Sequence, residues 1–149
     1  MGRFTAADRL LVFLDTNILI SALKGPDRQT GTLRLILRFL EREDIRLVGN
    51  TILLEEYARY IEALPAPTAA RLAAAILGKM EVIDPEERHV LACKPYFAAG
   101  AAADCVHAAT CLQTGALLLS NDRHFDAVVR AGLVRFLRTS EAIRRFAAE

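Results

Sequence analysis

Short apolar runs alternate with helical stretches along most of this sequence, and this alternation constrains the fold more than any other feature. The strand-like runs occupy residues 10–14, 45–50, 80–84, 116–120 and 134–137. Between them lie stretches whose apolar residues recur at helical spacing. A strand-helix repeat of this kind predicts an α/β fold, a three-layer α/β/α sandwich around a mainly parallel central sheet of about four to five strands.

The expected helices can be placed by their caps and by the prolines and glycines that end them. After a helix that begins near Asp15, further helices are expected over 32–44, 51–64, 68–78, 102–114, 122–132 and 140–149. A loop is expected at 24–31, and the segment 85–97 is expected to be helical only in its first half because Pro95 interrupts it.

The size of the chain indicates one domain, residues 1–149. With 149 residues and 53% hydrophobic composition, it can bury roughly two-thirds of its unfolded surface, and it contains no internal repeat or linker. The net charge of +1 provides no overall attraction to a nucleic acid or membrane, so any charged site must be local. The apolar runs are strand-length and the N-terminus lacks a signal-peptide pattern, so a cytoplasmic protein without membrane attachment is expected. The three cysteines are expected to be reduced core thiols.

Acidic side chains fall where this fold would bring them together. Asp15 comes directly after the first strand, and Asp122 follows the fourth. Glu55 and Glu56 lie in the first turns of the helix after the second strand, and Asp104 lies in the first turn of an alanine-rich helix. Ligands of open parallel sheets bind at the carboxyl ends of the strands. Four acidic positions are therefore expected to converge on one rim of the sheet.

Each acid also has a simpler interpretation. The three aspartates lie near predicted helix starts, where a carboxylate caps free backbone N–H groups, and adjacent glutamates usually belong to a solvated helix face. Four acids on one rim nevertheless favour a cation, because clustered carboxylates repel one another. Without the cation, this repulsion is expected to raise their apparent pKa values.

The ligand types favour Mg²⁺ or Mn²⁺ over zinc, because carboxylate oxygens suit hard ions and closely spaced Cys or His ligands are lacking. Such ions activate water and stabilise charge in phosphodiester hydrolysis without a nucleophilic side chain. The sequence has no glycine-rich phosphate loop, no GxSxG and no HExxH, which agrees with that chemistry.

Four motifs in order resemble those of the PIN-domain family. They read "VFLDTNILISAL", "LLEEYARYIE", "ADCVHAAT" and "LLLSNDRHFDAV", and they extend from the Asp15 region to Asp126. The resemblance implies a three-layer α/β/α fold and a metal-dependent ribonuclease. The family includes the VapC-like toxins of bacterial and archaeal toxin-antitoxin pairs.

The resemblance also implies roles for particular residues. Asp15 would be the first metal ligand, Glu56 the second acid, Asp104 the third, and Asp122 the fourth, which helps to place a second ion or a water. Glu55 competes with Glu56, because a shift of one residue turns a helical side chain by about 100°.

Three polar residues are expected to support these acids, again from the resemblance. Asn17 would hydrogen-bond to Asp15, Ser120 would be the small hydroxyl at the end of the fourth strand, and Asn121 would be the polar residue beside the last acid. Implied partners are an RNA substrate, a small antitoxin protein and a second copy of the chain in a homodimer.

The histidines and arginines leave further possibilities open. His107 shares a helix face with Asp104, so it either joins a mixed Asp-His site or packs beside the cluster. His89 and His124 have no evident acidic partner at ligand spacing. Six arginines in the last third are candidates for RNA phosphate contacts or for a solvated face: Arg123, Arg130, Arg135, Arg138, Arg144 and Arg145.

Other classes fit the sequence less well. An aspartyl-nucleophile phosphatase would need a second aspartate two residues after Asp15, where Asn17 stands. A receiver-type domain would need an acidic pair near the end of the first strand and a lysine after the last strand. The stretch VRFLRTSE, at the last strand, supplies no lysine. The sequence therefore favours a metal-dependent nuclease, and the resemblance implies that it is an endoribonuclease and the toxin of a toxin-antitoxin pair. The alternative is a catalytically silent module that binds a basic partner segment through its acidic pocket.

Overall fold

Five parallel strands form the centre of the protein, in the order β3-β2-β1-β4-β5. The structure, a computed structural model, describes residues 9–23, 31–63 and 67–147. The strands are β1 (Leu10–Leu14), β2 (Ile45–Gly49), β3 (Met80–Val82), β4 (Leu117–Leu119) and β5 (Arg135–Leu137). The α/β fold with a parallel sheet of four to five strands is confirmed.

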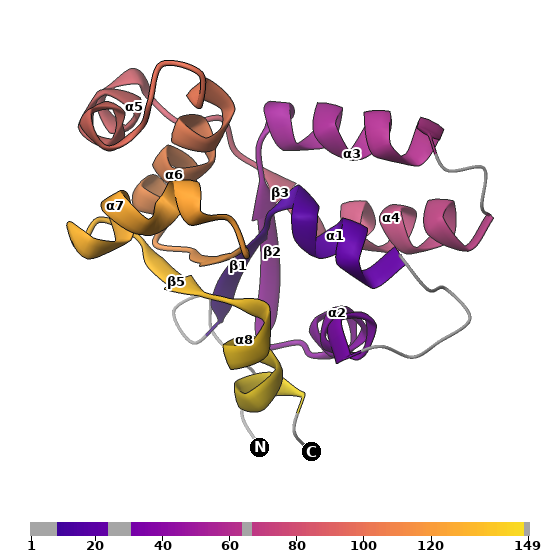
Figure 1. Cartoon of the computed structure of the whole chain (residues 1–149). Helices are drawn as coiled ribbons and strands as arrows, with labels where there is room; N and C mark the ends of the chain where they lie inside the picture. The colour runs from indigo at the N-terminus through magenta and orange to yellow at the C-terminus, as the bar shows by residue number, and fades with distance from the viewer. Residues whose placement is uncertain (1–8, 24–30, 64–66, 148–149) are drawn as a thin grey trace.

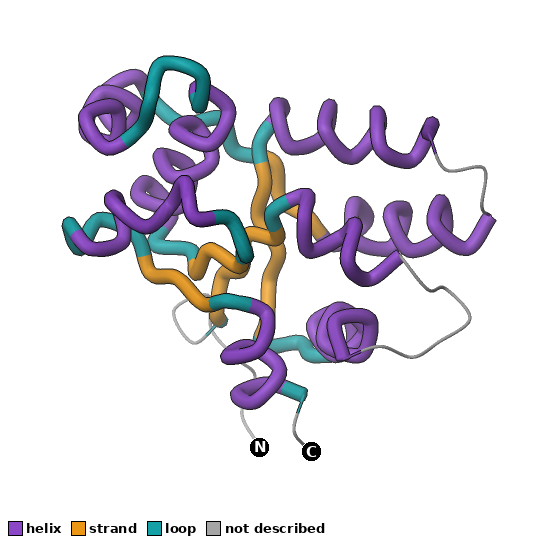
Figure 2. The backbone as a smooth tube through the Cα atoms, viewed as in Figure 1, coloured by secondary structure: helices purple, strands orange, loops and turns teal. Residues whose placement is uncertain are grey.

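Helices cover both sides of this sheet, as Figures 1 and 2 show. On one side lie α1 (Thr16–Leu23), α2 (Gly31–Glu41), α3 (Thr51–Ala63) and α4 (Pro67–Lys79). On the other lie α5 (Glu87–Cys93), α6 (Ala102–Thr114) and α7 (Asp126–Arg130), while α8 (Thr139–Phe146) packs against α2. No helix of the described ranges combines the length and apolarity needed to cross a bilayer.

The central strand β1 is apolar throughout because layers of helices cover both of its faces. Val12, Phe13 and Leu14 are almost completely buried. Tyr57 of α3 is also buried, and its hydroxyl donates to the carbonyl oxygen of Leu14 at 2.7 Å. This bond attaches α3 to the end of β1, where the acidic residues begin.

The three cysteines are free and buried, as expected for core thiols. Burial raises the pKa of Cys93 to about 11 and also raises the pKa values of Cys105 and Cys111. A thiol with a raised pKa carries little thiolate at neutral pH, so these side chains pack as small apolar groups.

Several expected elements differ in length from those observed. The strands expected over 80–84 and 116–120 are three residues long, and the helix expected over 122–132 is a 3₁₀ turn, η3 (Arg123–Phe125), followed by α7. The carboxylate of Asp122 accepts from the backbone N–H of His124 at 2.9 Å, which explains this tighter start. The helical first half of 85–97 is confirmed by α5. The α-helix ends at Cys93, and a 3₁₀ turn that contains Pro95, η2 (Lys94–Tyr96), follows it. Most of the expected loop at 24–31 lies outside the described residues.

Candidate metal centre

The carboxyl ends of β1, β2 and β4 bring polar side chains to one edge of the sheet. Asp15 follows β1, Asn50 follows β2, and Ser120 follows β4. All three are buried, with Asp15 only 5% exposed. The parallel pairing of these strands explains the convergence, because each strand delivers its next residue to the same edge.

Asp15 is the most buried acid of this edge, and three donors hold it. Its Oδ2 accepts from the hydroxyl of Ser120 at 2.6 Å and from Nδ2 of Asn17 at 3.2 Å. Its Oδ1 accepts from the backbone N–H of Thr16 at 2.9 Å. Burial holds the pKa of Asp15 above its ordinary value, although the hydrogen bonds from Ser120 and Thr16 lower it, and the negative charge of Asp104 adds to the rise. A cation beside Asp15 would remove this penalty.

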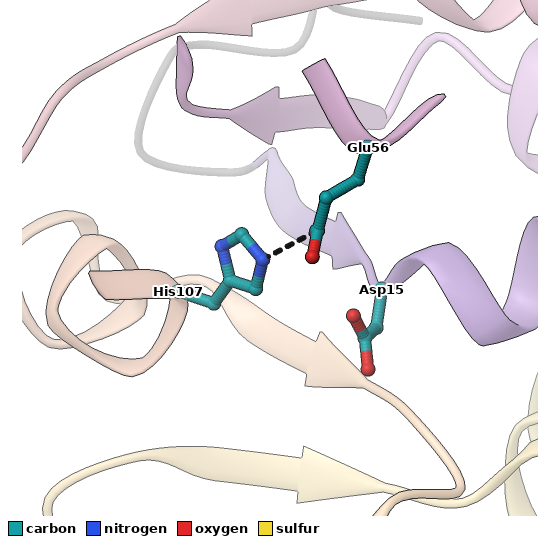
Figure 3. A group of neighbouring side chains, drawn as sticks. All are labelled: Asp15, Glu56 and His107. Atoms are coloured by element: carbon teal, nitrogen blue, oxygen red, sulfur yellow. Dashed lines mark hydrogen bonds and ion pairs between the residues drawn. The ribbon is translucent and has the colours of Figure 1, made fainter. Parts of the chain in front are cut away.

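Glu56 points from α3 toward Asp15 and His107 (Figure 3). Its Oε1 accepts from Nε2 of His107 at 2.7 Å and from the hydroxyl of Thr16 at 3.1 Å. Burial acts to raise the pKa of Glu56, but the hydrogen bonds from His107 and Thr16 leave it below its ordinary value. The neighbouring Glu55 is exposed on the outer face of α3. Of the two adjacent glutamates, Glu56 is therefore the one whose carboxylate lies beside Asp15.

Ligand atoms of Asp15, Glu56 and His107 lie within 4.8 Å of one another, so these residues form a first cluster. The sequence led us to expect raised pKa values for such a group. The pKa of Asp15 is raised, as expected, and burial is the main cause. The pKa of Glu56 is instead lowered, because His107 and Thr16 donate hydrogen bonds to it.

A second cluster contains the other two acids. Atoms of Asp104, Asp122 and His124 also lie within 4.8 Å of one another. Nδ1 of His124 lies 2.8 Å from Oδ2 of Asp104 and 3.3 Å from Oδ1 of Asp122. The hydrogen bond with Asp104, and then the charge of Asp122, raise the pKa of His124. The expectation that His124 has no acidic partner was wrong, because the turn after β4 carries it back over the start of α6.

The three supporting residues lie at this edge in different ways. Asn17 and Ser120 both donate to Oδ2 of Asp15, and Asn17 also donates to the Ser120 hydroxyl at 3.2 Å. Asn121 faces away: its side chain donates to the hydroxyl of Thr139 at 2.7 Å and accepts from the Thr139 backbone N–H at 3.0 Å. Only the backbone N–H of Asn121 meets this network, at 3.4 Å from Oδ1 of Asn17.

Sequence reasoning did not single out Thr16, Asn50 or Tyr57 for the contacts they make. Asn50 follows β2 as Asp15 follows β1, so the strand-end argument applied to all strands would have found it. The bonds of Thr16 to Glu56 and of Tyr57 to Leu14 join residues about 40 positions apart, and no local pattern signals them.

The donor set of the first cluster suits a hard divalent cation. Asp15 and Glu56 supply carboxylate oxygens, and burial leaves the charge of Asp15 poorly solvated. Oxygen ligands of this kind are typical of Mg²⁺ and Mn²⁺. The fold and this edge together define a parallel α/β protein with an acidic cluster at the carboxyl ends of its central strands.

Comparison with protein-family models identifies the family. The model described as the PIN domain matches residues 12–131, which is most of the chain. The protein belongs to the PIN domain family. A search of curated proteins by sequence gave no match.

Solved structures with the same fold include two VapBC complexes and one FitAcB complex. The structure of VapBC2 from Rickettsia felis, bound to a DNA fragment from their promoter, matches with a TM-score of 0.63 and 16% identity over 87% of this chain and 98% of that chain. VapBC-1 from nontypeable Haemophilus influenzae matches with a TM-score of 0.61 and 17% identity, over 88% of this chain and 99% of that chain. FitAcB from Neisseria gonorrhoeae matches with a TM-score of 0.56 and 20% identity, over 87% of this chain and 98% of that chain. At these identities the similarity establishes the fold alone.

Proposed function

We propose that residues 1–149 form one metal-dependent endoribonuclease domain that hydrolyses RNA phosphodiester bonds with Mg²⁺ or Mn²⁺. The observation that carries this proposal is the pair of neighbouring carboxylates, Asp15 and Glu56, each held by hydrogen bonds at the carboxyl edge of the sheet. Membership of the PIN domain family supports the same chemistry.

Asp15 and Glu56 are the residues that would hold the ion in the first cluster, and Asp104 and Asp122 would contribute from the second. A divalent ion supplies activation of water and stabilisation of negative charge on phosphate oxygens. Ser120 and Asn17 orient the Asp15 carboxylate, and Thr16 orients Glu56 while its backbone holds Asp15. These hydrogen bonds thus orient both carboxylates in the absence of substrate.

An RNA substrate would need local positive charge, because the chain as a whole is almost neutral. Arg123 is exposed in η3, directly after Asp122, and is the arginine nearest in sequence to the acidic edge. Arg138 is engaged elsewhere, with the carbonyl of Asn121 and the carboxylate of Asp126. Arg123 is therefore the better candidate for a phosphate contact.

The biological setting that we propose is a toxin-antitoxin pair. The structural neighbours include VapBC and FitAcB complexes, in which a chain of this fold is accompanied by a second protein. By analogy, this chain would be the toxin, a cytoplasmic homodimer whose acidic pocket is covered by a small antitoxin.

The test uses the intact chain and a matched pair of glutamate variants. Cleavage of a mixed structured and single-stranded RNA pool, with Mn²⁺, is measured for the wild type and for Asp15→Asn, Glu56→Gln and Glu55→Gln. Calorimetric titration with Mn²⁺ is run on the same preparations. Asp15→Asn and Glu56→Gln should lose both cleavage and binding, whereas Glu55→Gln should keep both, since Glu55 is exposed on the other face of α3.

The outcomes separate the two candidate functions. Metal binding by the wild type without cleavage of any RNA would favour the silent interaction module, in which the acidic pocket binds a basic partner segment. Absence of metal binding would overturn the nuclease proposal and leave Asp15 as a helix-capping residue.

A further inference from the structure

A chain of buried polar groups runs behind the first cluster and ends at Glu56. Thr110, Asn50 and His107 are each completely buried. Nδ2 of Asn50 lies 3.0 Å from the hydroxyl of Thr110 and 3.1 Å from Nδ1 of His107. The opposite ring nitrogen, Nε2, lies 2.7 Å from Oε1 of Glu56. Because water does not reach these groups, each must satisfy its neighbour as donor or acceptor.

Two independent contacts fix the orientation of the Asn50 amide. Its oxygen accepts from the backbone N–H of Leu53 at 2.8 Å, in the first turn of α3. On its other side, the hydroxyl hydrogen of Thr110 is already donated to the carbonyl of Val106 at 3.0 Å, so Thr110 can only accept from Asn50. An inverted amide would break both contacts. The Asn50 nitrogen therefore faces His107.

The orientation of Asn50 determines the hydrogen position on His107. Asn50 donates to Nδ1, so Nδ1 carries a lone pair and the ring hydrogen is on Nε2. A hydrogen on Nδ1 would set two N–H donors against each other inside the protein. We infer that His107 is a positioning residue: it is fixed as the Nε2–H tautomer, donates to Oε1 of Glu56, and is not itself a metal ligand.

This inference removes His107 from the candidate metal ligands of the first cluster. Its meaning for function rests on the proposed nuclease activity. By distance alone, His107 belongs to the first cluster with Asp15 and Glu56. Nε2, however, has no lone pair to offer while it donates to Glu56. The bonds from His107 and Thr16 both fall on Oε1 and neither engages Oε2. Without a nitrogen ligand from His107, the first cluster offers only the carboxylate oxygens of Asp15 and Glu56, which favours Mg²⁺ or Mn²⁺ over Zn²⁺.

Two variants of His107 separate positioning from packing. The shorter amide of His107→Asn places its oxygen near the position of Nδ1, so it can accept from Asn50, but it provides no donor to Glu56. The longer amide of His107→Gln reaches the position of Nε2 and can donate to Glu56. Affinity for Mn²⁺, measured by calorimetry, should fall about 10- to 100-fold in His107→Asn, and His107→Gln should recover most of this loss.

The tautomer is measured directly by nitrogen-15 NMR at neutral pH. The signals of His107 are assigned by their loss in His107→Gln. We expect hydrogen on Nε2 and none on Nδ1, in the metal-free protein and equally after saturation with Mg²⁺. Hydrogen on Nδ1 in the metal-free protein overturns the inference, and so does loss of the Nε2 hydrogen when Mg²⁺ binds, because that loss would make His107 a ligand.

Failure of this inference is distinguishable from failure of the proposed function. The metal-free spectrum requires neither an ion nor an RNA. If the wild type bound no Mn²⁺, the nuclease proposal would fail while an Nε2–H tautomer would still support donation to Glu56. Equal Mn²⁺ affinity in the wild type and His107→Asn would instead leave the nuclease intact and overturn the positioning role.

Discussion

Ser120 and Asp15, 105 positions apart in the sequence, are joined by a hydrogen bond of 2.6 Å between the Ser120 hydroxyl and Oδ2 of the carboxylate. The same hydroxyl accepts from Nδ2 of Asn17 at 3.2 Å and from the backbone N–H of Asp122 at 3.0 Å. One buried hydroxyl therefore connects the acid after β1 to the turn that carries the acid after β4.

Replacing Ser120 with alanine should weaken metal binding without unfolding the protein. The Asp15 carboxylate would lose its shortest hydrogen bond, so its charged form would become harder to maintain. We expect the affinity for Mn²⁺ at pH 7 to fall about tenfold, as is typical for residues that orient metal ligands. Calorimetric titration measures this change, with Ser140→Ala as the control because Ser140 is exposed on α8. Unchanged affinity in Ser120→Ala would contradict the orienting role.

The fold could be predicted well because its signal is repeated along the chain. Each strand is a short, mostly apolar run, and β1 is apolar at every position since both of its faces are covered. The ends of elements were less predictable. The helix expected from Asp122 onward begins as a 3₁₀ turn, because the Asp122 side chain takes the backbone N–H of His124.

The candidate site could be predicted in part. Residues that follow strands, such as Asp15 and Asp122, are found by their position alone, and the family resemblance added Asn17 and Ser120. The contact between His124 and Asp104 could not be predicted, because it depends on how the turn after β4 packs against α6. Such contacts depend on tertiary packing, and neither partner's neighbouring residues indicate them.

Binding of Mn²⁺ should stabilise the folded protein, because the carboxylates come together only in the native state. At a free ion concentration of 100 times Kd, the expected gain in the free energy of unfolding is about 2.7 kcal/mol. The midpoint of thermal unfolding should then rise by several degrees and return when a chelator is added. Asp15→Asn should show no such rise. An equal rise in that variant would mean that the ion binds elsewhere.

Acid should destabilise the protein in part through Asp84, which lies after β3 and holds the start of α3. Its carboxylate accepts from the backbone N–H of Thr51 at 2.8 Å and from the Thr51 hydroxyl at 2.7 Å. The backbone hydrogen bond, and then the hydroxyl bond, hold the pKa of Asp84 below its ordinary value. A lowered folded pKa gives stability that is present above the pKa of the unfolded chain and lost as the pH falls through the folded value.

Asp84→Asn tests this pH dependence. Asparagine keeps an acceptor but has no charge to lose, so the variant should be less stable than the wild type by about 0.5 kcal/mol at pH 7, a modest value because Asp84 is exposed and screened. This difference should shrink toward zero as the pH falls through the lowered pKa of the folded state, because below it Asp84 is protonated in both states. Urea unfolding at several pH values measures it. A difference that stayed constant with pH would show that the charge of Asp84 contributes nothing.

Lys79, the last residue of α4, should stabilise the end of α2 through its ammonium group. Nζ donates to the carbonyl oxygens of Phe39 and of Arg42, the latter at 2.7 Å. The last carbonyl oxygens of a helix have no partner within the helix, and the helix dipole also favours a cation at this end. Lys79→Met keeps much of the apolar stem but removes the donors, so the free energy of unfolding should fall by about 1 kcal/mol.

The matched control for Lys79 is Arg46, which pairs with Glu81 at the protein surface. The two side chains are 36% and 50% exposed, so Arg46→Met should cost less than about 0.5 kcal/mol. Urea unfolding of both variants compares a cation that satisfies helix carbonyls with one in an exposed ion pair. If the two substitutions cost the same, the carbonyl contacts of Lys79 add nothing beyond an ordinary surface charge. A larger loss for Lys79→Met would identify it as the residue that joins α4 to the end of α2.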